Sequence, residues 1–264
     1  MKIAPKGIKS RTMQLNGNNQ HILEKTRKNG NHHSYVSQGA RVGIDMEEHF
    51  ELLGDQHLMT GLATPMLPDA FAMSDEDKVR IIEAHFEKIM HTLGLDLQDD
   101  SLRGTPRRVA KMYVKEIFSG LNPKNRPKVS VFDNAYQYGQ MLVEKNIKVK
   151  STCEHHFLPI LGKAHVAYYS AGQVIGLSKL NRFVDYFARR PQVQERMTRQ
   201  IAEELKKILN TEDVAVVIEA VHHCVVCRGI EDEGSTTLTA EYSGKFKEAG
   251  VKDEFLRYLQ LRIS

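Results

Sequence analysis

The first regular pattern in the chain is an apolar residue at every third or fourth position, which is typical of an amphipathic helix. It begins after Ser74, where the spacing Ser74-x-x-Asp77 resembles a capping box, and it ends at Gly94. Its apolar positions are Val79, Ile82, Phe86, Ile89 and Leu93. A second helix is expected from Thr105-Pro106 to Gly120, because proline is favoured in the first turn of a helix.

Beyond residue 128 the pattern changes, and β-branched and aromatic residues alternate or run together. We expect strands at 141–150, 163–169, 213–226 and 235–242, and helices at 178–189 and 191–209, the latter opened by Pro191. The strands are largely neighbours in sequence, which favours antiparallel pairing. The fold class is therefore predicted to be α+β, an antiparallel sheet with helices on one face.

The N-terminal part of the chain lacks such a pattern. Residues 1–40 contain seven Lys or Arg and one acidic residue, Glu24, and we interpret them as a disordered basic tail. This tail is either a solvated leader or an arm that attracts a partner or an anion. Residues 41–73 are expected to form an irregular linker that can dock on the folded part. The domain proper is predicted to span 74–264, with a helical part at 74–122 and a sheet-containing part at 128–264.

Charge and composition narrow the function only slightly. The net charge of +4 suits a small anionic substrate as well as it suits weak contact with nucleic acid. There is no apolar run of the length that spans a membrane, and the first residues lack the apolar core of a signal peptide. We therefore expect a cytoplasmic protein with no membrane partner. Its three cysteines are too few for a disulfide framework, so reduced thiols are expected.

The stretch STCEHHFLPI, residues 151–160, concentrates groups that bind transition metals. Zinc accepts thiolate and imidazole together, and Cys153-x-x-His156 can reach one ion if the chain bends between them. A structural zinc site would need a second pair, and Cys224-x-x-Cys227 is the candidate. However, the two pairs lie about 70 residues apart, unlike those of a compact zinc finger.

Strand parity offers a way to choose between the two later cysteines. If 213–228 is one extended strand, His222, Cys224 and Arg228 share one face and Cys227 faces the other way. The metal would then have three protein ligands and a fourth position for water, the pattern of a catalytic zinc. His155 and His222 adjoin these ligands, and imidazole transfers protons near pH 7.

Two other groups carry weaker signals. Ser178, Lys179 and Arg182 form a phosphate site if Ser178 caps a helix, or otherwise a basic surface patch. Gln194 and Glu195 could recognise the donor edge of a purine, or they could be an ordinary helix surface.

Four stretches taken together resemble the type I GTP cyclohydrolase family, over roughly residues 74–245. They occur in the order and spacing of that family, and they read DDSLRGTPRRVAKMYVKEIFSGL, STCEHHFLPILGKAHVAY, VIGLSKLNRFVDYFARRPQVQERMTRQIA and VHHCVVCRG. The resemblance implies a tunnelling fold and a homodecamer with active sites at subunit junctions. It also implies hydrolysis of GTP at guanine C8 to formate and 7,8-dihydroneopterin triphosphate, the first step of folate and tetrahydropterin synthesis.

The same resemblance implies residue roles. It implies one zinc per subunit on Cys153, His156 and Cys224, with His155, His222 and Ser178 in catalysis. Triphosphate contacts fall on Lys179, Arg182 and Arg228, and on Arg108 from a neighbouring chain, while Gln194 and Glu195 match the guanine-reading pair. Glu154 receives no role, and Cys227 occupies a variable position.

Two alternatives are kept at this point. One is a non-catalytic, zinc-stabilised module that binds nucleic acid, which would need four protein ligands and neither His155 nor His222. The other is a different pterin enzyme of the tunnelling fold, against which the combination of CEHH and VHHC argues.

Overall fold

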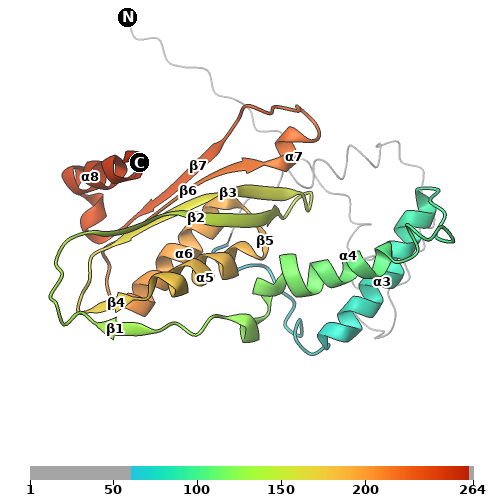
Figure 1. Ribbon diagram of the computed structural model, residues 1–264, viewed down its shortest axis with the longest axis horizontal. Coiled ribbons are helices and arrows are strands. Elements are labelled where there is room, and N and C mark those ends of the chain that lie inside the picture. The colour runs from blue at the N-terminus through green and yellow to red at the C-terminus, as the bar shows by residue number, and fades with distance from the viewer. Residues whose placement is uncertain (1–60, 262–264) are drawn as a thin grey trace, which may run out of the picture. The chain divides into compact units, whose positions relative to one another are not determined.

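The structure is a computed structural model that describes residues 61–261 (Figure 1). The expected tail over 1–40, and the expected linker as far as residue 60, lie outside the described residues. Within residues 61–261, every helix is too short or too polar to cross a lipid bilayer.

A five-stranded sheet with the strand order β5-β2-β3-β6-β7 forms the centre of the fold. The pairs β2–β3, β3–β6 and β6–β7 are antiparallel, and only the short β5 runs parallel to β2. The strands span Leu142–Cys153 (β2), Pro159–Tyr168 (β3), Pro191–Gln192 (β5), Val214–His222 (β6) and Thr237–Tyr242 (β7). A separate two-stranded sheet pairs β1 (Val131–Asp133) with β4 (Gln173–Ile175). The α+β class and the antiparallel pairing are as predicted.

Two helices cover one face of the sheet (Figure 1). They are α5 (Leu177–Ala188) and α6 (Gln194–Leu209), and each buries its apolar stripe against the strands. Alternate residues of β3, such as Ala164 and Val166, point into this core, because successive side chains of a strand face opposite sides.

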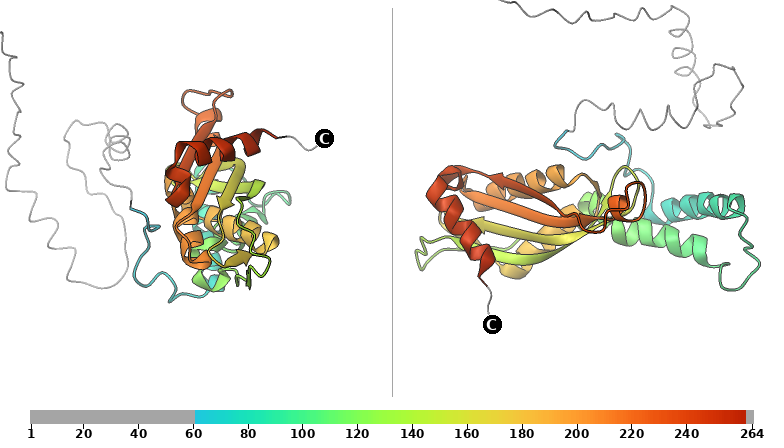
Figure 2. Two further views of the ribbon diagram at one scale, coloured as in Figure 1. Left: turned by 90° about the vertical axis from the view of Figure 1, so that its left-hand side faces the viewer. Right: turned by 90° about the horizontal axis from the view of Figure 1, so that it is seen from above.

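The opposite face carries one more helix, which the sequence pattern did not predict. This helix, α8 (Ala249–Gln260), packs Phe255 against Phe246 and against the outward residues of β3 and β6. Seen from above, α8 lies toward one end of the sheet, while α3 and α4 lie side by side beyond the other end (Figure 2). The prediction that helices cover one face of the sheet is therefore incomplete, because α8 packs on the other face.

The N-terminal helices form where the periodicity placed them. In α3 (Asp75–Thr92) the Ser74 hydroxyl accepts a hydrogen bond from Asp77 N at 3.1 Å, which satisfies one of the free N–H groups of the first turn. The second helix is α-helical over Thr105–Met112 (α4) and then widens into a π-helical turn, Tyr113–Ile117. Short 3-10 turns follow at Ser119–Leu121 and Pro123–Asn125.

The strands predicted over 141–150 and 163–169 extend further toward the turn between them, to Cys153 and from Pro159. Two further errors change the type of element. The strand expected over 213–226 ends at His222, and His223–Val226 form a single helical turn, α7. Pro191 does not open a helix, because it pairs with Thr152 in β5 and α6 begins only at Gln194. Both errors fall where the end of an element is set by pairing with a strand remote in sequence.

Gly162 provides a test of the close pairing between β3 and β6. A Cβ at this position would lie 2.1 Å from the Glu219 carbonyl oxygen and 2.5 Å from the Ala220 Cβ. Gly162→Ala is therefore expected to lower the free energy of unfolding by about 1–3 kcal/mol, as overpacking does, with a reduced Tm in thermal unfolding followed by circular dichroism. Gly250→Ala in α8, where a Cβ meets nothing within 4 Å, is the matched control and should leave Tm unchanged or slightly raised. Equal Tm values for both variants would contradict this.

Candidate functional site

The hairpin between β2 and β3 presents the first group of candidate residues. Cys153 is the last residue of β2, and the chain then turns back through residues 154–158. Two backbone hydrogen bonds close this turn, from Cys153 N to Leu158 O (2.8 Å) and from Phe157 N to Cys153 O (2.9 Å). Phe157 adopts the left-handed conformation, with φ of 56°. The bend that a Cys-x-x-His pair requires is thus built into the hairpin.

The register of β3 and β6 brings the second group to the same edge. Ile160, near the start of β3, pairs with His222, the last residue of β6. The helical turn α7 follows His222 directly, so Cys224 lies beside the β2–β3 turn although it is remote in sequence. Both α7 and this hairpin lie at the same end of the sheet in Figure 1.

Cys153, His156 and Cys224 form a group that could hold a metal ion. Their ligand atoms lie within 4.8 Å of one another, with Cys153 buried, Cys224 half-buried and His156 exposed. Among the described residues the group has three members. Two sulfurs and one ring nitrogen are a donor set typical of zinc, and three protein ligands leave a coordination position open.

The electrostatics of the two thiols also fit a cation. Burial, followed by the neighbouring Cys153 thiol, raises the pKa of Cys224 to about 11. The Cys224 sulfur can therefore be a thiolate near neutral pH only if a positive charge lies beside it. A divalent metal supplies that charge and displaces the thiol protons when it binds.

Cys227 does not belong to this group, although the parity argument excluded it for the wrong reason. That argument assumed one strand over 213–228, whereas the strand stops at His222 and Cys224 lies in a helical turn. Cys227 is exposed, and its Sγ lies 3.7 Å from His223 Nδ1. The structure thus places Cys224 with Cys153 and His156 through the register of the sheet, and not through strand parity.

Both candidate proton-transfer histidines lie at this end of the sheet. The Nδ1 of His155 is 3.7 Å from Cys153 Sγ, and its Nε2 is 4.0 Å from a carboxylate oxygen of Glu154. His222 is half-buried, and burial lowers its pKa, which the Glu195 carboxylate partly offsets. Burial therefore favours the neutral form of His222.

Gln194, expected to face guanine or solvent, is buried beneath His222. Its Nε2 faces three acceptors, Ile218 O at 3.0 Å, Thr237 O at 2.9 Å and Thr239 Oγ1 at 3.1 Å. These contacts fix the amide orientation and turn its Oε1 toward His222 Nε2, 2.8 Å away. Within this chain both N–H donors of the amide are used, so a contact from Nε2 to guanine would replace one of these hydrogen bonds. Glu195, by contrast, is exposed.

Arg228 lies over the metal-binding group, whereas Arg108 does not contact it. Arg228 Nη1 is 2.9 Å from His156 Nε2, which brings a guanidinium to the rim of the group. Arg108 folds back on the start of its own helix, where it donates to Thr105 Oγ1 at 2.8 Å and to Ser101 O at 3.2 Å.

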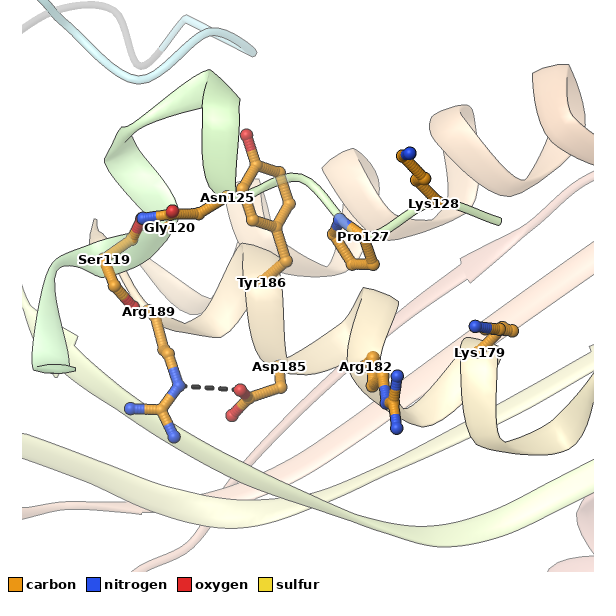
Figure 3. A pocket seen from close by; sticks show the side chains of 10 residues that line it. All are labelled: Ser119, Gly120, Asn125, Pro127, Lys128, Lys179, Arg182, Asp185, Tyr186 and Arg189. Atoms are coloured by element: carbon orange, nitrogen blue, oxygen red, sulfur yellow. Dashed lines mark hydrogen bonds and ion pairs between the residues drawn. The ribbon is translucent and has the colours of Figure 1, made fainter. Parts of the chain in front are cut away.

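A separate basic pocket of about 410 Å³ runs along α5 (Figure 3). Lys179 and Arg182 line it, and so do Lys128 and Arg189, which the sequence pattern did not single out. Arg189 is already paired with Asp185 at 2.6 Å. The condition that Ser178 caps the helix is not met, because the N-cap is Gly176 and Ser178 lies exposed inside the first turn.

Lys179 and the metal-binding group lie toward opposite ends of the sheet. The start of α5 is fixed beside Tyr168, whose hydroxyl accepts a hydrogen bond from Ile175 N at 3.2 Å. Tyr168 is eight residues along β3 from Ile160, which at about 3.3 Å per residue is a separation of roughly 25 Å. One chain therefore does not bring its own Ser178 and Lys179 to its own Cys153.

Comparison with known proteins decides the family. The sequence profile of the family described as GTP cyclohydrolase I matches residues 82–260, more than half of the chain. The chain belongs to the GTP cyclohydrolase I family. A protein named GTP cyclohydrolase 1 from Flavobacterium johnsoniae is 59% identical over 218 residues, which cover 83% of this chain and 98% of that protein.

Other members of the GTP cyclohydrolase I family are nearly as similar. Proteins named GTP cyclohydrolase 1 from Citrobacter koseri and Aeromonas salmonicida are each 52% identical, over 75% and 74% of this chain and 89% of their own lengths. The family resemblance inferred from the four sequence stretches is thereby confirmed.

Substitution of the two later cysteines tests the metal-binding group in this family member. Cys224→Ser should weaken Co²⁺ binding by more than the roughly 10- to 100-fold that loss of a hydrogen-bond partner to a ligand causes, and should reduce the thiolate-to-cobalt absorption. Cys227→Ser is the matched control, since its sulfur lies outside the group, and its Co²⁺ spectrum should match that of the wild type. A Cys227→Ser protein that loses the absorption would show that the ligands are misassigned.

Proposed function

We propose that the chain hydrolyses GTP at guanine C8, releasing formate and forming 7,8-dihydroneopterin triphosphate. The observation that carries this proposal is the Cys153-His156-Cys224 group with two histidines beside it, in a member of the GTP cyclohydrolase I family. The rival reading, a zinc-stabilised nucleic-acid module, required four protein ligands, and the group has three among the described residues.

One zinc ion per subunit is proposed on Cys153, His156 and Cys224. The sulfur and nitrogen donors fit zinc, and the raised pKa of Cys224 fits a site completed by a cation. Zinc, when bound, supplies a Lewis acid that lowers the pKa of water and so makes hydrolysis at C8 possible near neutral pH.

His222 and His155 are proposed to move the protons of the reaction. Because Gln194 Oε1 faces His222 Nε2, the neutral ring keeps its proton on Nε2, and Nδ1 is left to accept one. Nδ1 would take up a proton from solvent to form the imidazolium and would then pass that proton to guanine N7, which returns the ring to its neutral form. Protonation at N7 makes C8 more electrophilic. His155, exposed on the hairpin turn, would serve the later steps together with Ser178 near the ribose.

Cationic side chains are proposed to bind the triphosphate. Lys179 and Arg182 provide two positive charges in the pocket along α5, and Arg228 provides a third at the rim of the metal-binding group. Arg108 is proposed to act on the triphosphate of a neighbouring chain. Glu195 is proposed to accept hydrogen bonds from guanine, with Gln194 joining it if the bond to His222 is exchanged.

We also propose that each active site is shared between chains of a homo-oligomer, with a decamer as the assembly. The separation of Lys179 from Cys153 within one chain supports this, because one nucleotide would have to reach both ends of the sheet. Large apolar side chains that stay exposed in the single chain also support it. On α3 and the segment before it they include Leu67, Ile89 and Leu93.

The activity is tested by incubating the protein with GTP, then oxidising the mixture and measuring neopterin fluorescence and released formate. The zinc-loaded protein should produce both products in equal amounts. Removal of the metal with a chelator should abolish formate release, and added Zn²⁺ should restore it. Full turnover by protein whose zinc content is shown to be negligible would refute the scheme.

Mixed oligomers test whether the site is shared. Cys224→Ser and Lys179→Ala should each be nearly inactive alone, one for lack of metal and the other for weak triphosphate binding. If the two residues serve the same site from different chains, co-assembled variants should regain up to about a quarter of wild-type activity, since a random mixture forms intact pairs at that frequency. Mixing the variants without subunit exchange is the control. No recovery after verified co-assembly would show that both residues act within one chain.

A further inference from the structure

An ion pair between a buried arginine and a half-buried glutamate supports the turn that carries the proposed metal ligands. Glu154 lies between Cys153 and His155 in the sequence, and its carboxylate is held by Arg196 of α6. Nη1 of Arg196 lies 2.5 Å from Glu154 Oε2, and Nη2 lies 3.1 Å from Oε1. Two nitrogens of one guanidinium therefore bind both oxygens of the carboxylate. This two-pronged contact fixes the orientation of the Glu154 carboxylate as well as its distance from Arg196.

The pair is shielded from water on the side of α6. The side chain of Arg196 is 3% exposed and that of Glu154 is 21% exposed. The third guanidinium donor, Nε, bonds to Gly61 O at 3.0 Å, and Gln200, one helical turn later, donates to Leu62 O at 2.7 Å. Gly61 and Leu62 are thus hydrogen-bonded to α6 beside the arginine. Partial shielding from water strengthens the attraction between the two charges and so the preference for this geometry.

The same carboxylate also faces the proposed catalytic groups. Glu154 Oε1 is 4.0 Å from His155 Nε2, and the Glu154 backbone N donates to Gln192 O at 3.1 Å. On the other side of the turn, the Phe157 ring packs edge-on against Phe118, with ring centroids 5.2 Å apart. His155 and His156 themselves are exposed, so the direction in which the turn presents them depends on these anchors to either side.

We propose that the Glu154–Arg196 pair is a positioning device that fixes the turn so that His156 meets the metal and His155 meets the reacting atoms. Neither residue touches metal or substrate in this scheme, and both act through the turn. The inference rests on the proposed zinc site and adds a role for Glu154, for which sequence reasoning found none. Loss of the Glu154 charge leaves the buried Arg196 guanidinium without its counter-ion, and loss of Arg196 releases the half-buried Glu154 carboxylate, so in both cases the turn should move toward solvent.

The test compares zinc release and catalysis in the full-length protein. Glu154→Gln keeps the shape of the side chain but not its charge, Arg196→Met removes the guanidinium, and Arg196→Lys keeps the charge but not the two-pronged contact. Arg199→Met is the matched control, because Arg199 is exposed on the same helix. Zinc release is followed with a chromogenic chelator in excess, and kcat and KM for GTP are measured on fully zinc-loaded protein.

We expect Glu154→Gln and Arg196→Met to release zinc about 10- to 100-fold faster and to lower kcat by a similar factor, the usual effect of losing a support of a ligand. The KM for GTP should change little, because neither residue contacts the nucleotide. Arg196→Lys should fall between these variants and the wild type, and Arg199→Met should match the wild type. A purely structural role would lower Tm but leave zinc release from the folded protein unchanged.

The outcomes separate this inference from the proposed function. If the wild type itself binds no zinc or releases no formate, the proposed function is wrong. If the wild type does both, and the folded variants agree with it within about twofold in zinc release and kcat, the positioning role is overturned. Should Arg196→Met fail to fold, Glu154→Gln and Arg196→Lys decide the question by the same measurements.

Discussion

The antiparallel register of β3 and β6 is the constraint on which the candidate site depends. Because Ile160 pairs with His222, the start of β3 lies beside the end of β6. The β2–β3 hairpin closes at that edge and α7 begins there, so ligands from distant parts of the chain meet without any long loop. A shift of this register by one residue would turn the apolar faces of the strands outward, so the buried core that stabilises the fold also holds the site together.

Behind this edge lies a set of buried polar side chains at the start of α6. Gln194 supports His222, Arg196 supports Glu154, and Gln200 ties the helix to Leu62. Burying such groups is unfavourable unless each finds its partners, and here nearly all of the polar atoms do. Helix α6 therefore has two structural roles. Its apolar stripe packs on the sheet, and its first turns hold the residues around the metal-binding group.

The distance between the two functional regions has a simple structural cause. The helix α5 starts beside Tyr168 and runs back toward the hairpin turn, so its first cationic residues are held far from Cys153. Within one chain the basic pocket along α5 and the metal-binding group are therefore separate features of the fold. This separation is the structural observation behind the proposal that neighbouring chains complete each site.

The sequence by itself determined the elements with strong periodicity, because a repeating apolar stripe reports local geometry. The helices α3, α5 and α6 and the strands β2, β3 and β7 lie close to their predicted ranges, and the four family stretches led to the correct family. The sequence pattern also brought Cys153, His156 and Cys224 together as candidates, but it did so through a strand that the fold does not contain.

Tertiary structure alone decided where elements stop and which polar residues turn inward. The strand β6 ends at His222, opposite Ile160, and the next residue of β3, Pro159, has no N–H with which to continue the pairing. Pro191 forms β5 because it pairs with Thr152 of β2. The hydrogen-bond partners of Gln194 and Glu154 lie in other elements. Hydrogen bonds between residues remote in sequence produce no periodic pattern that sequence analysis could detect. Local patterns encode helices and strands, whereas pairing register and buried polar contacts arise only when those elements meet.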